Sequence, residues 1–353
     1  MTVKVKGLLF GLTMATVLAI AATTSAQVPP DIAEGLRKIG QIVDPACTAK
    51  LYRPLMPAND YNTYWPPGAA APVSTASLYP GITIARDQSF GADPKDVVDI
   101  FTADKGGGNR PVLIFVPGGA GNKIEQQVRE ANAFYDNIGR WAAKNGMVGV
   151  LMQRRPGRGN WDDGGRDIAT AVDWIKANVA KYRGNPNRMF IWAHSAGTGP
   201  LGVYIGHPQR WPNGVAVKGA IFMSGNPVPS IGGGGAGGRG AGPGGGGGRG
   251  GQALTPEQQA ERDNLPGFKA TNVKIMLARA ELDPGVSGDM TAADKALHDE
   301  MCKVDGAKAK DGAGHCPTMF YVKGHSHMSE VFSPDTADRT VTDPILNWMK
   351  KVK

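Results

Sequence analysis

Short apolar runs alternate with helical patterns along most of the chain, and this alternation constrains the fold more than any other feature of the sequence. The runs have the length and composition of buried strands. They lie at residues 111–116, 147–152, 189–192, 217–223, 273–277 and 319–322. Strands that alternate with helices build a parallel sheet covered on both faces. The sequence therefore predicts an α/β fold with functional residues at the carboxyl ends of the strands.

Apolar residues with helical spacing predict helices between these strands. The first apolar face comprises Ile168, Val172, Ile175 and Val179, the second Ala293, Leu297, Met301 and Val304, and the third Val341, Ile345, Trp348 and Met349. We expect the first helix to end near Gly184 and Thr291 to cap the second. The third is expected near residues 340–351.

The first 26 residues have the pattern of a secretory signal peptide. Lys4 and Lys6 precede an apolar run at residues 8–22, and small residues follow up to Ala26. This pattern predicts cleavage after Ala26. The apolar run is shorter than the roughly 20 residues that span a bilayer. We therefore expect residues 27–353 to form a periplasmic or secreted single domain without stable membrane insertion.

The composition bears on binding partners and on the redox state. The formal net charge is +8, and the basic residues are scattered, which does not indicate nucleic-acid binding. The spacing of the three cysteines fits no zinc motif. Cys302 and Cys316 bracket a loop, so we predict a disulfide between them with Cys47 left free.

One segment departs from the α/β pattern. Residues 232–251 read GGGGAGGRGAGPGGGGGRGG and contain no apolar residue larger than alanine. Such a composition cannot bury enough apolar surface to pack a core. We therefore predict that this tract is a disordered insertion in the domain.

A serine follows one of the predicted strands at a turn of small residues. Residues 189–192 lead into Ala-His-Ser-Ala-Gly at positions 193–197. The nucleophile turn G-x-S-x-G has glycine where this chain has Ala193, and it requires small residues because the next helix lies close to the strand. Ser195 is therefore a candidate nucleophile. The alternative is a small-residue turn without chemistry.

The loop after residues 111–116 is rich in glycine. It reads Pro-Gly-Gly-Ala-Gly-Asn at positions 117–122. Backbone N–H groups in such a loop are free to point at a developing negative charge. Those of Gly119 and Ala120, together with the N–H of Ala196, are candidates for an oxyanion hole. The alternative is an ordinary glycine turn.

A carboxylate and a histidine follow two later strands, in the chain order of Ser-Asp-His triads on this kind of sheet. Glu281 and Asp283 are both candidate acids, and strand alternation does not choose between them. Asp283 is favoured because it precedes Pro284-Gly285, where the chain leaves the strand. His325 and His327 are two residues apart, so an extended loop points them in opposite directions.

These motifs resemble those of the α/β-hydrolase superfamily, in its feruloyl-esterase-like and hormone-sensitive-lipase-like carboxylesterase branch. The resemblance is carried by residues 90–94, 98–101, 115–120, 154–155, 161–167, 173–175 and 182–188 and by the serine turn. The family's oxyanion loop usually reads His-Gly-Gly, and here Pro117 replaces the histidine that generally orders it. The match implies that Ser195 is the nucleophile, Asp283 the acid and His327 the base. The family's histidine usually precedes an apolar and a small residue, as His327 does.

The resemblance implies a serine esterase that forms an acyl-enzyme and needs neither a metal nor an organic cofactor. Members typically act on small acyl esters or acylated plant polymers. Acyl or feruloyl esters of plant-derived material are therefore the expected substrates. Two alternatives remain: a formamidase or lactonase with the same triad, and a non-catalytic binding module on the same fold.

Overall fold

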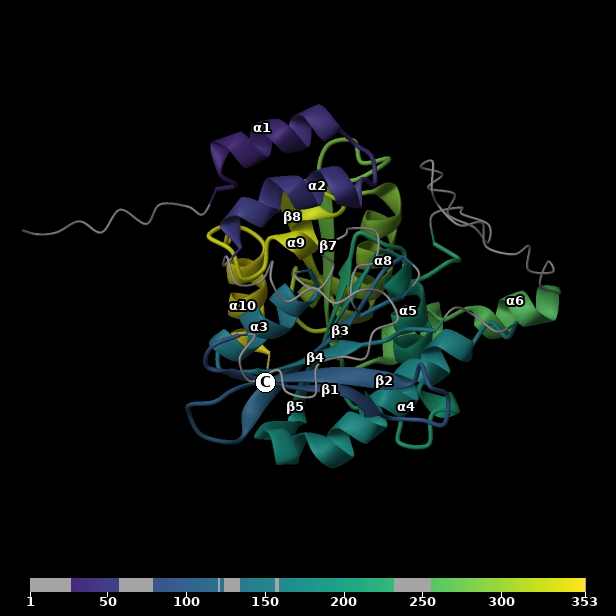
Figure 1. The fold of residues 1–353 in the computed structure, drawn as a ribbon. Coiled ribbons are helices and arrows are strands. Elements are labelled where there is room, and N and C mark those ends of the chain that lie inside the picture. The colour runs from purple at the N-terminus through teal and green to yellow at the C-terminus, as the bar shows by residue number, and fades with distance from the viewer. Residues whose placement is uncertain are drawn as a thin grey trace, which may run out of the picture.

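A computed structural model describes residues 27–56, 79–119, 121–123, 134–155, 159–231 and 255–352 (Figure 1). The predicted signal peptide and the predicted glycine-rich insertion lie outside these ranges. Within them, no helix combines the length and the apolar character needed to cross a membrane.

The described ranges contain an eight-stranded sheet with the order β1-β2-β4-β3-β5-β6-β7-β8. The strands are β1 (Ile82–Ser89), β2 (Val97–Ala103), β3 (Arg110–Val116), β4 (Val148–Met152), β5 (Gly184–His194), β6 (Gly219–Met223), β7 (Lys274–Leu282) and β8 (Thr318–Ser326). All pairs from β4 to β8 along this order are parallel, whereas β2 pairs antiparallel with both β1 and β4. The predicted, mostly parallel α/β sheet is confirmed.

The apolar pattern did not predict β1 and β2, because charged residues interrupt both strands. Asp99 lies fully buried in β2. Its carboxylate accepts hydrogen bonds from Arg86 of β1 and from Lys123, both at 2.7 Å. A buried charge of this kind is tolerated because opposite charges pair with it.

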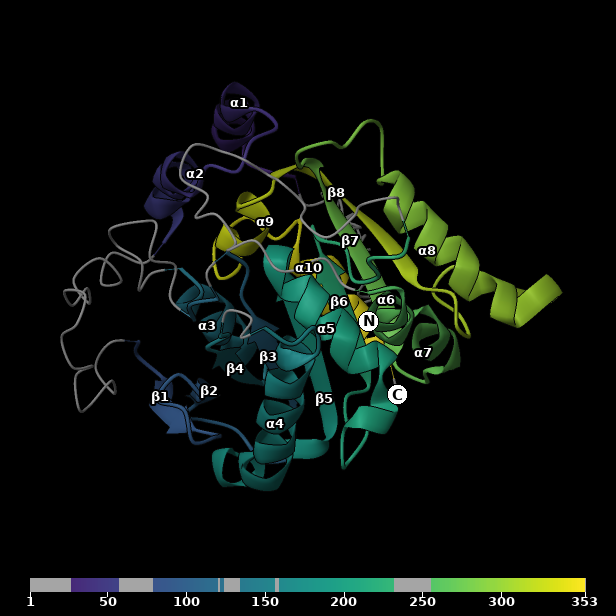
Figure 2. The same ribbon diagram turned by 90° about the vertical axis from the view of Figure 1, so that its right-hand side faces the viewer.

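Helices cover both faces of the sheet (Figures 1 and 2). They are α1 (Pro30–Ile39), α2 (Pro45–Tyr52), α3 (Asp136–Lys144), α4 (Asp163–Asn178), α5 (Thr198–Gly206), α6 (Pro256–Arg262), α7 (Leu265–Ala270), α8 (Ala292–Cys302), α9 (Ser329–Phe332) and α10 (Thr342–Lys351). The three predicted helices correspond to α4, α8 and α10. Thr291 caps α8 as predicted. The placement of Val304 on its apolar face is wrong, because α8 ends at Cys302 and Val304 is exposed.

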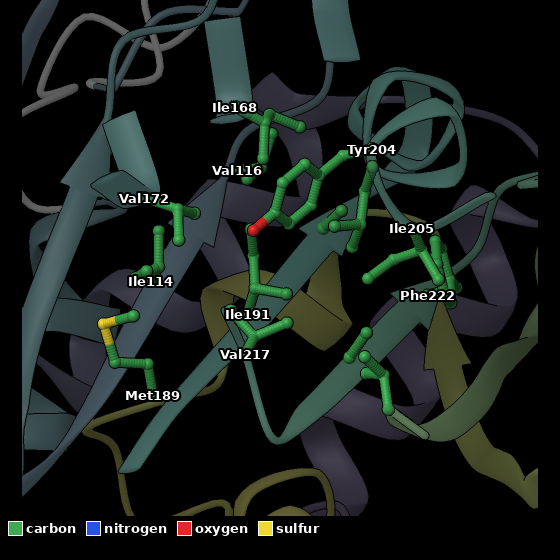
Figure 3. Close-up of a cluster of buried hydrophobic side chains, with 14 of the residues drawn as sticks. Ile114, Val116, Ile168, Val172, Met189, Ile191, Tyr204, Ile205, Val217 and Phe222 are labelled. Atoms are coloured by element: carbon green, nitrogen blue, oxygen red, sulfur yellow. The ribbon is translucent and has the colours of Figure 1, made fainter. Parts of the chain in front are cut away.

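Successive residues along a strand point to opposite faces of the sheet. Their side chains therefore pack into two separate hydrophobic cores, one on each face. Leu113 and Phe115 of β3 join the core beneath α3 and α10. Val112, Ile114 and Val116 of the same strand join the core beneath α4 and α5. Figure 3 shows part of this second core, where aliphatic side chains of β3 and α4 meet the ring of Tyr204 from α5.

The structure confirms the predicted disulfide. Cys302, at the end of α8, is bonded to Cys316, and Cys47 is free and exposed. A bridge that closes a loop of about 15 residues stabilises a protein by roughly 3 kcal/mol in the chain-entropy estimate.

We therefore expect the double variant C302S/C316S to lose about 3 kcal/mol of unfolding free energy. Urea denaturation of the oxidised wild type and of the variant measures this difference. The single variant C47S is the control, because Cys47 forms no bridge. Equal urea midpoints for wild type and the double variant would show that the bridge does not stabilise the fold.

Candidate active site

Ser195 lies at the sharp turn between β5 and α5, at the carboxyl end of the sheet. Its backbone is left-handed, with φ +51°, a strained conformation for a residue other than glycine. Small neighbours make the turn possible. A Cβ atom at Gly197 would lie 2.7 Å from the carbonyl oxygen of Val116 in β3. Ala193 fits in the buried end of β5.

Ser195, His327 and Asp283 are brought together by the ends of β5, β7 and β8. The Oγ of Ser195 lies 2.8 Å from Nε2 of His327. Nδ1 of the same imidazole lies 2.5 Å from Oδ1 of Asp283. His327 and Asp283 are buried, whereas Ser195 is partly exposed. Of the three hydrogen-bonded side chains, that of Ser195 is thus the one that solvent reaches.

Arg279 of β7 holds the second oxygen of Asp283. Its Nη1 donates to Oδ2 of Asp283 at 2.7 Å, and its Nε and Nη2 donate to Asp294. Burial acts to raise the pKa of Asp283, but the hydrogen bond from His327 and the charge of Arg279 outweigh it. The pKa of Asp283 therefore lies below its usual value, and the side chain is a carboxylate at neutral pH. Asp294 offsets the charge of Arg279.

The other candidate acid, Glu281, has a different partner. Its Oε2 accepts a hydrogen bond from the backbone N–H of Gly324 at 2.6 Å. This contact ties β7 to Gly324 near the end of β8. Of the two carboxylates that the sequence left open, Asp283 is the one that reaches His327.

The other candidate base, His325, is buried in a polar network away from Ser195. Its Nε2 lies 2.6 Å from Oγ1 of Thr340, and its Nδ1 lies 3.0 Å from Oγ of Ser329. Its ring stacks on Tyr52 of α2, whose hydroxyl donates to Asp338. His325 thus joins the N-terminal helices to the loop that carries His327.

We expect His325→Ala to lower the free energy of unfolding by about 2–4 kcal/mol, because it leaves a cavity and unpaired buried polar groups. Urea denaturation measures this loss. His298→Ala is the control, because His298 is more exposed, on the surface of α8. An unfolding free energy for His325→Ala equal to that of wild type would contradict the structural role.

His194 and Glu330 lie behind the imidazole of His327. Nε2 of His194 donates to the carbonyl oxygen of His327 at 2.8 Å, and the two rings are 4.7 Å apart. Burial lowers the pKa of His194 to about 4. Burial, reinforced by the charge of Asp283, raises the pKa of Glu330 well above its usual value. Both shifts favour the neutral form of the side chain.

Atoms of His194, His327 and Glu330 lie close enough together to hold a metal ion. The hydrogen bonds argue against this use. Both ring nitrogens of His327 are engaged, one by Ser195 and one by Asp283. Nε2 of His194 is engaged by a carbonyl oxygen. His327 would therefore have to give up its hydrogen bond to Ser195 or Asp283 in order to bind a metal ion.

The predicted oxyanion loop packs directly against the serine. A Cβ atom at Gly118 would lie 2.7 Å from Cβ of Ser195. No described residue accepts a hydrogen bond from the N–H of Gly119. Ala196 is exposed in the first turn after the serine, where backbone N–H groups lack helical partners. Ala120 lies outside the described residues.

These contacts define what the arrangement does chemically. A hydroxyl that donates to an imidazole, whose other nitrogen donates to a carboxylate, is the arrangement that activates serine for attack on a carbonyl carbon. Free N–H groups beside the hydroxyl suit the oxyanion that such an attack produces.

Comparison with known sequences points to ester hydrolases. The BD-FAE family matches residues 98–209. Esterase LipC of Mycobacterium tuberculosis is 28% identical over 180 residues, which are 50% of this chain and 43% of that protein. The probable carboxylic ester hydrolase LipM of the same organism is 34% identical over 94 residues, 26% of this chain and 20% of the relative. The chain thus spans less than half the length of these relatives.

Comparison with solved structures shows the fold. A truncated carbohydrate esterase from gut microbiota superposes with a TM-score of 0.52 at 15% identity, over 76% of this chain and 97% of that one. Thermogutta terrifontis esterase 2, phosphorylated by paraoxon, gives a TM-score of 0.51 at 13% identity, over 77% and 91% of the two chains. In each comparison the matched region includes nearly all of the solved esterase's own chain.

Proposed function

We propose that the chain is a serine hydrolase of carboxylic esters, on a fold like that of solved esterases and with a match to the BD-FAE family over residues 98–209. The observation that carries this proposal is the hydrogen-bonded chain from Ser195 through His327 to Asp283 at a strained turn. Similarity to an esterase and a carboxylic ester hydrolase supports it.

In the proposed reaction, Oγ of Ser195 attacks the carbonyl carbon while Nε2 of His327 takes its proton. Asp283 holds the imidazole tautomer and stabilises the cation that forms. The N–H groups of Gly119, Ala120 and Ala196 bind the oxyanion. His327 then protonates the leaving alcohol, and an acyl-enzyme forms. Water, activated by the same imidazole, releases the acid.

We propose acyl or feruloyl esters of plant-derived material as the substrate class. The match to BD-FAE and the likeness in fold to a carbohydrate esterase support this choice. A panel of p-nitrophenyl, feruloyl, acetyl-xylan, lactone and N-formyl substrates tests it. Turnover confined to the N-formyl or lactone substrates would assign the same triad to a formamidase or lactonase.

A fluorophosphonate probe separates an enzyme from a binding module on this fold. We expect the probe to modify Ser195 of the wild type and to leave S195A unlabelled. Paraoxon is a second probe, since a solved esterase of similar fold is phosphorylated by it. A wild type that neither probe labels, and that turns over no substrate of the panel, would support the binding module.

We also propose that the protein is exported. The signal-peptide pattern of residues 1–26 supports this, and so does the disulfide, since such bonds persist in oxidising compartments. Sequencing the N-terminus of protein from the periplasm or medium is expected to begin at Gln27. Recovery of the full-length chain from the cytoplasm alone would contradict export.

A further inference from the structure

We infer that Arg154 is the positioning residue of the oxyanion loop, and that it holds the loop by the carbonyl groups of Pro117, Gly118 and Gly119. This inference rests on the proposed function, because it assigns Arg154 a part in the same reaction. Pro117 itself has neither an N–H nor a polar side chain with which to order the loop. Among the described side chains, only Arg154 donates to these three carbonyls.

The guanidinium of Arg154 lies along the loop. Its Nε donates to the carbonyl oxygen of Pro117 at 3.2 Å, and its Nη2 donates to those of Gly118 at 3.4 Å and Gly119 at 2.6 Å. The side chain is buried, with 7% of the residue exposed. A planar fork of donors in a fixed place presents a rigid template to successive carbonyls.

The backbone of Arg154 holds the far end of the same loop. Its N–H donates to the carbonyl oxygen of Gly121 at 2.6 Å. Gly121 adopts φ +89°, and a Cβ atom there would lie 2.4 Å from the carbonyl oxygen of Arg154. The two backbones therefore meet where only glycine fits. Main chain and side chain of one residue thus fix both ends of the turn.

Holding a carbonyl also sets the direction of the next N–H. In a trans peptide the C=O and N–H bonds point in opposite directions. The carbonyl of Gly118 is held by Arg154 and by the N–H of Gly121. The N–H of Gly119 is consequently turned away from Arg154, and no described residue accepts its hydrogen bond. It remains available for a substrate oxygen.

The charge of Arg154 adds to this effect. No carboxylate among the described residues lies within ion-pair distance of its guanidinium. Burial lowers the pKa of Arg154, and the electrostatic interactions with Tyr135 and Asp167 offset this only in part, so the carbonyl dipoles are the groups that contact the buried cation directly. A cation behind these carbonyls polarises the peptide groups, which strengthens hydrogen bonds from their N–H sides to a developing anion.

Arg110 offers a matched control. It is also buried, with 6% exposed, and its guanidinium also donates to three carbonyls, those of Ala103 at the end of β2 and of Lys105 and Gly107 in the following loop. Burial lowers its pKa as well. Arg110 begins β3, however, about 20 Å from the end that leads to the oxyanion loop. R110Q thus removes a comparable set of hydrogen bonds at the opposite end of the same strand.

The experiment compares R154Q, R154K and R110Q with wild type on one p-nitrophenyl ester, below the unfolding temperature of each variant. We expect R154Q to lower kcat by about 10²-fold with KM within about threefold, because the lost interaction acts on the transition state. R154K keeps the charge without the fork, so we expect a smaller loss of kcat. R110Q is expected to keep kcat while lowering stability.

Hydrogen exchange of the segment that covers residues 110–123 gives a readout independent of activity. We expect faster exchange there in R154Q and R154K than in wild type, with unchanged exchange in β6 and β7. Wild-type kcat in R154Q, or a loss of kcat that R110Q reproduces, would overturn the inference. If the wild type hydrolyses no ester, the proposed function fails, and unchanged exchange in R154Q would then refute the anchoring separately.

Discussion

Replacing Ser195 with alanine is expected to lower ester turnover by roughly five to six orders of magnitude, as loss of a triad nucleophile does. The variant keeps the loop and the imidazole but has no oxygen with which to form the acyl-enzyme. Steady-state kinetics on a p-nitrophenyl ester, with active-site titration of the wild type, measures the loss. Near-normal turnover by S195A would refute Ser195 as the nucleophile.

The fold of S195A is expected to survive, because one partly exposed hydroxyl contributes little to stability. Ser224 is a matched control for the backbone strain. It lies at the end of the adjacent strand β6 with φ +48°, and its Oγ accepts from the N–H of Ala280. Ser224→Ala should cost some stability and leave the fluorophosphonate label on Ser195 intact. Loss of labelling in Ser224→Ala would show that the strained residues after β5 and β6 depend on each other.

Replacing Asp283 with asparagine is expected to lower kcat by about 10⁴-fold, because an amide does not hold His327 in the tautomer that accepts the serine proton. The position also faces Arg279, which loses a carboxylate partner in the variant. We therefore expect some loss of stability as well. Kinetics, with thermal unfolding in parallel, separates the two effects.

Glu281→Gln is the control for Asp283→Asn. An amide oxygen at position 281 still accepts the hydrogen bond from the N–H of Gly324, so we expect kcat close to that of wild type. The reverse outcome, with Glu281→Gln inactive and Asp283→Asn active, would mean that the acid is Glu281.

The sequence predicted the strands β3 to β8 because their apolar runs are continuous. It did not predict β1 and β2, where Asp99 and Arg86 interrupt the pattern and pair with each other across the strands. In the sequence alone, two charged residues of this kind are expected to face solvent. Only the folded chain shows that the two charges cancel inside the protein.

The sequence placed Ser195, Asp283 and His327 on the correct strand ends, because chain order and turn composition are local features. It did not assign the partners that hold them. Arg279 precedes Asp283 by four residues without any motif, and Arg154 reaches the oxyanion loop from another strand end. Roles of this kind arise from tertiary contacts, which the periodicity of a single sequence does not encode.

The hydrogen bond between Ser195 and His327 joins residues 132 positions apart in the chain. We expect contacts between residues so far apart in the chain to form late in folding, because bringing them together costs the conformational entropy of the intervening residues. Ester turnover during refolding is therefore a reporter of complete assembly, and should recover no earlier than the slowest tertiary signal. A nascent chain that has emerged only as far as β6 already carries the serine turn but lacks both the carboxylate and the imidazole. We therefore expect no ester hydrolysis from such an intermediate, and activity only after β8 has joined the sheet.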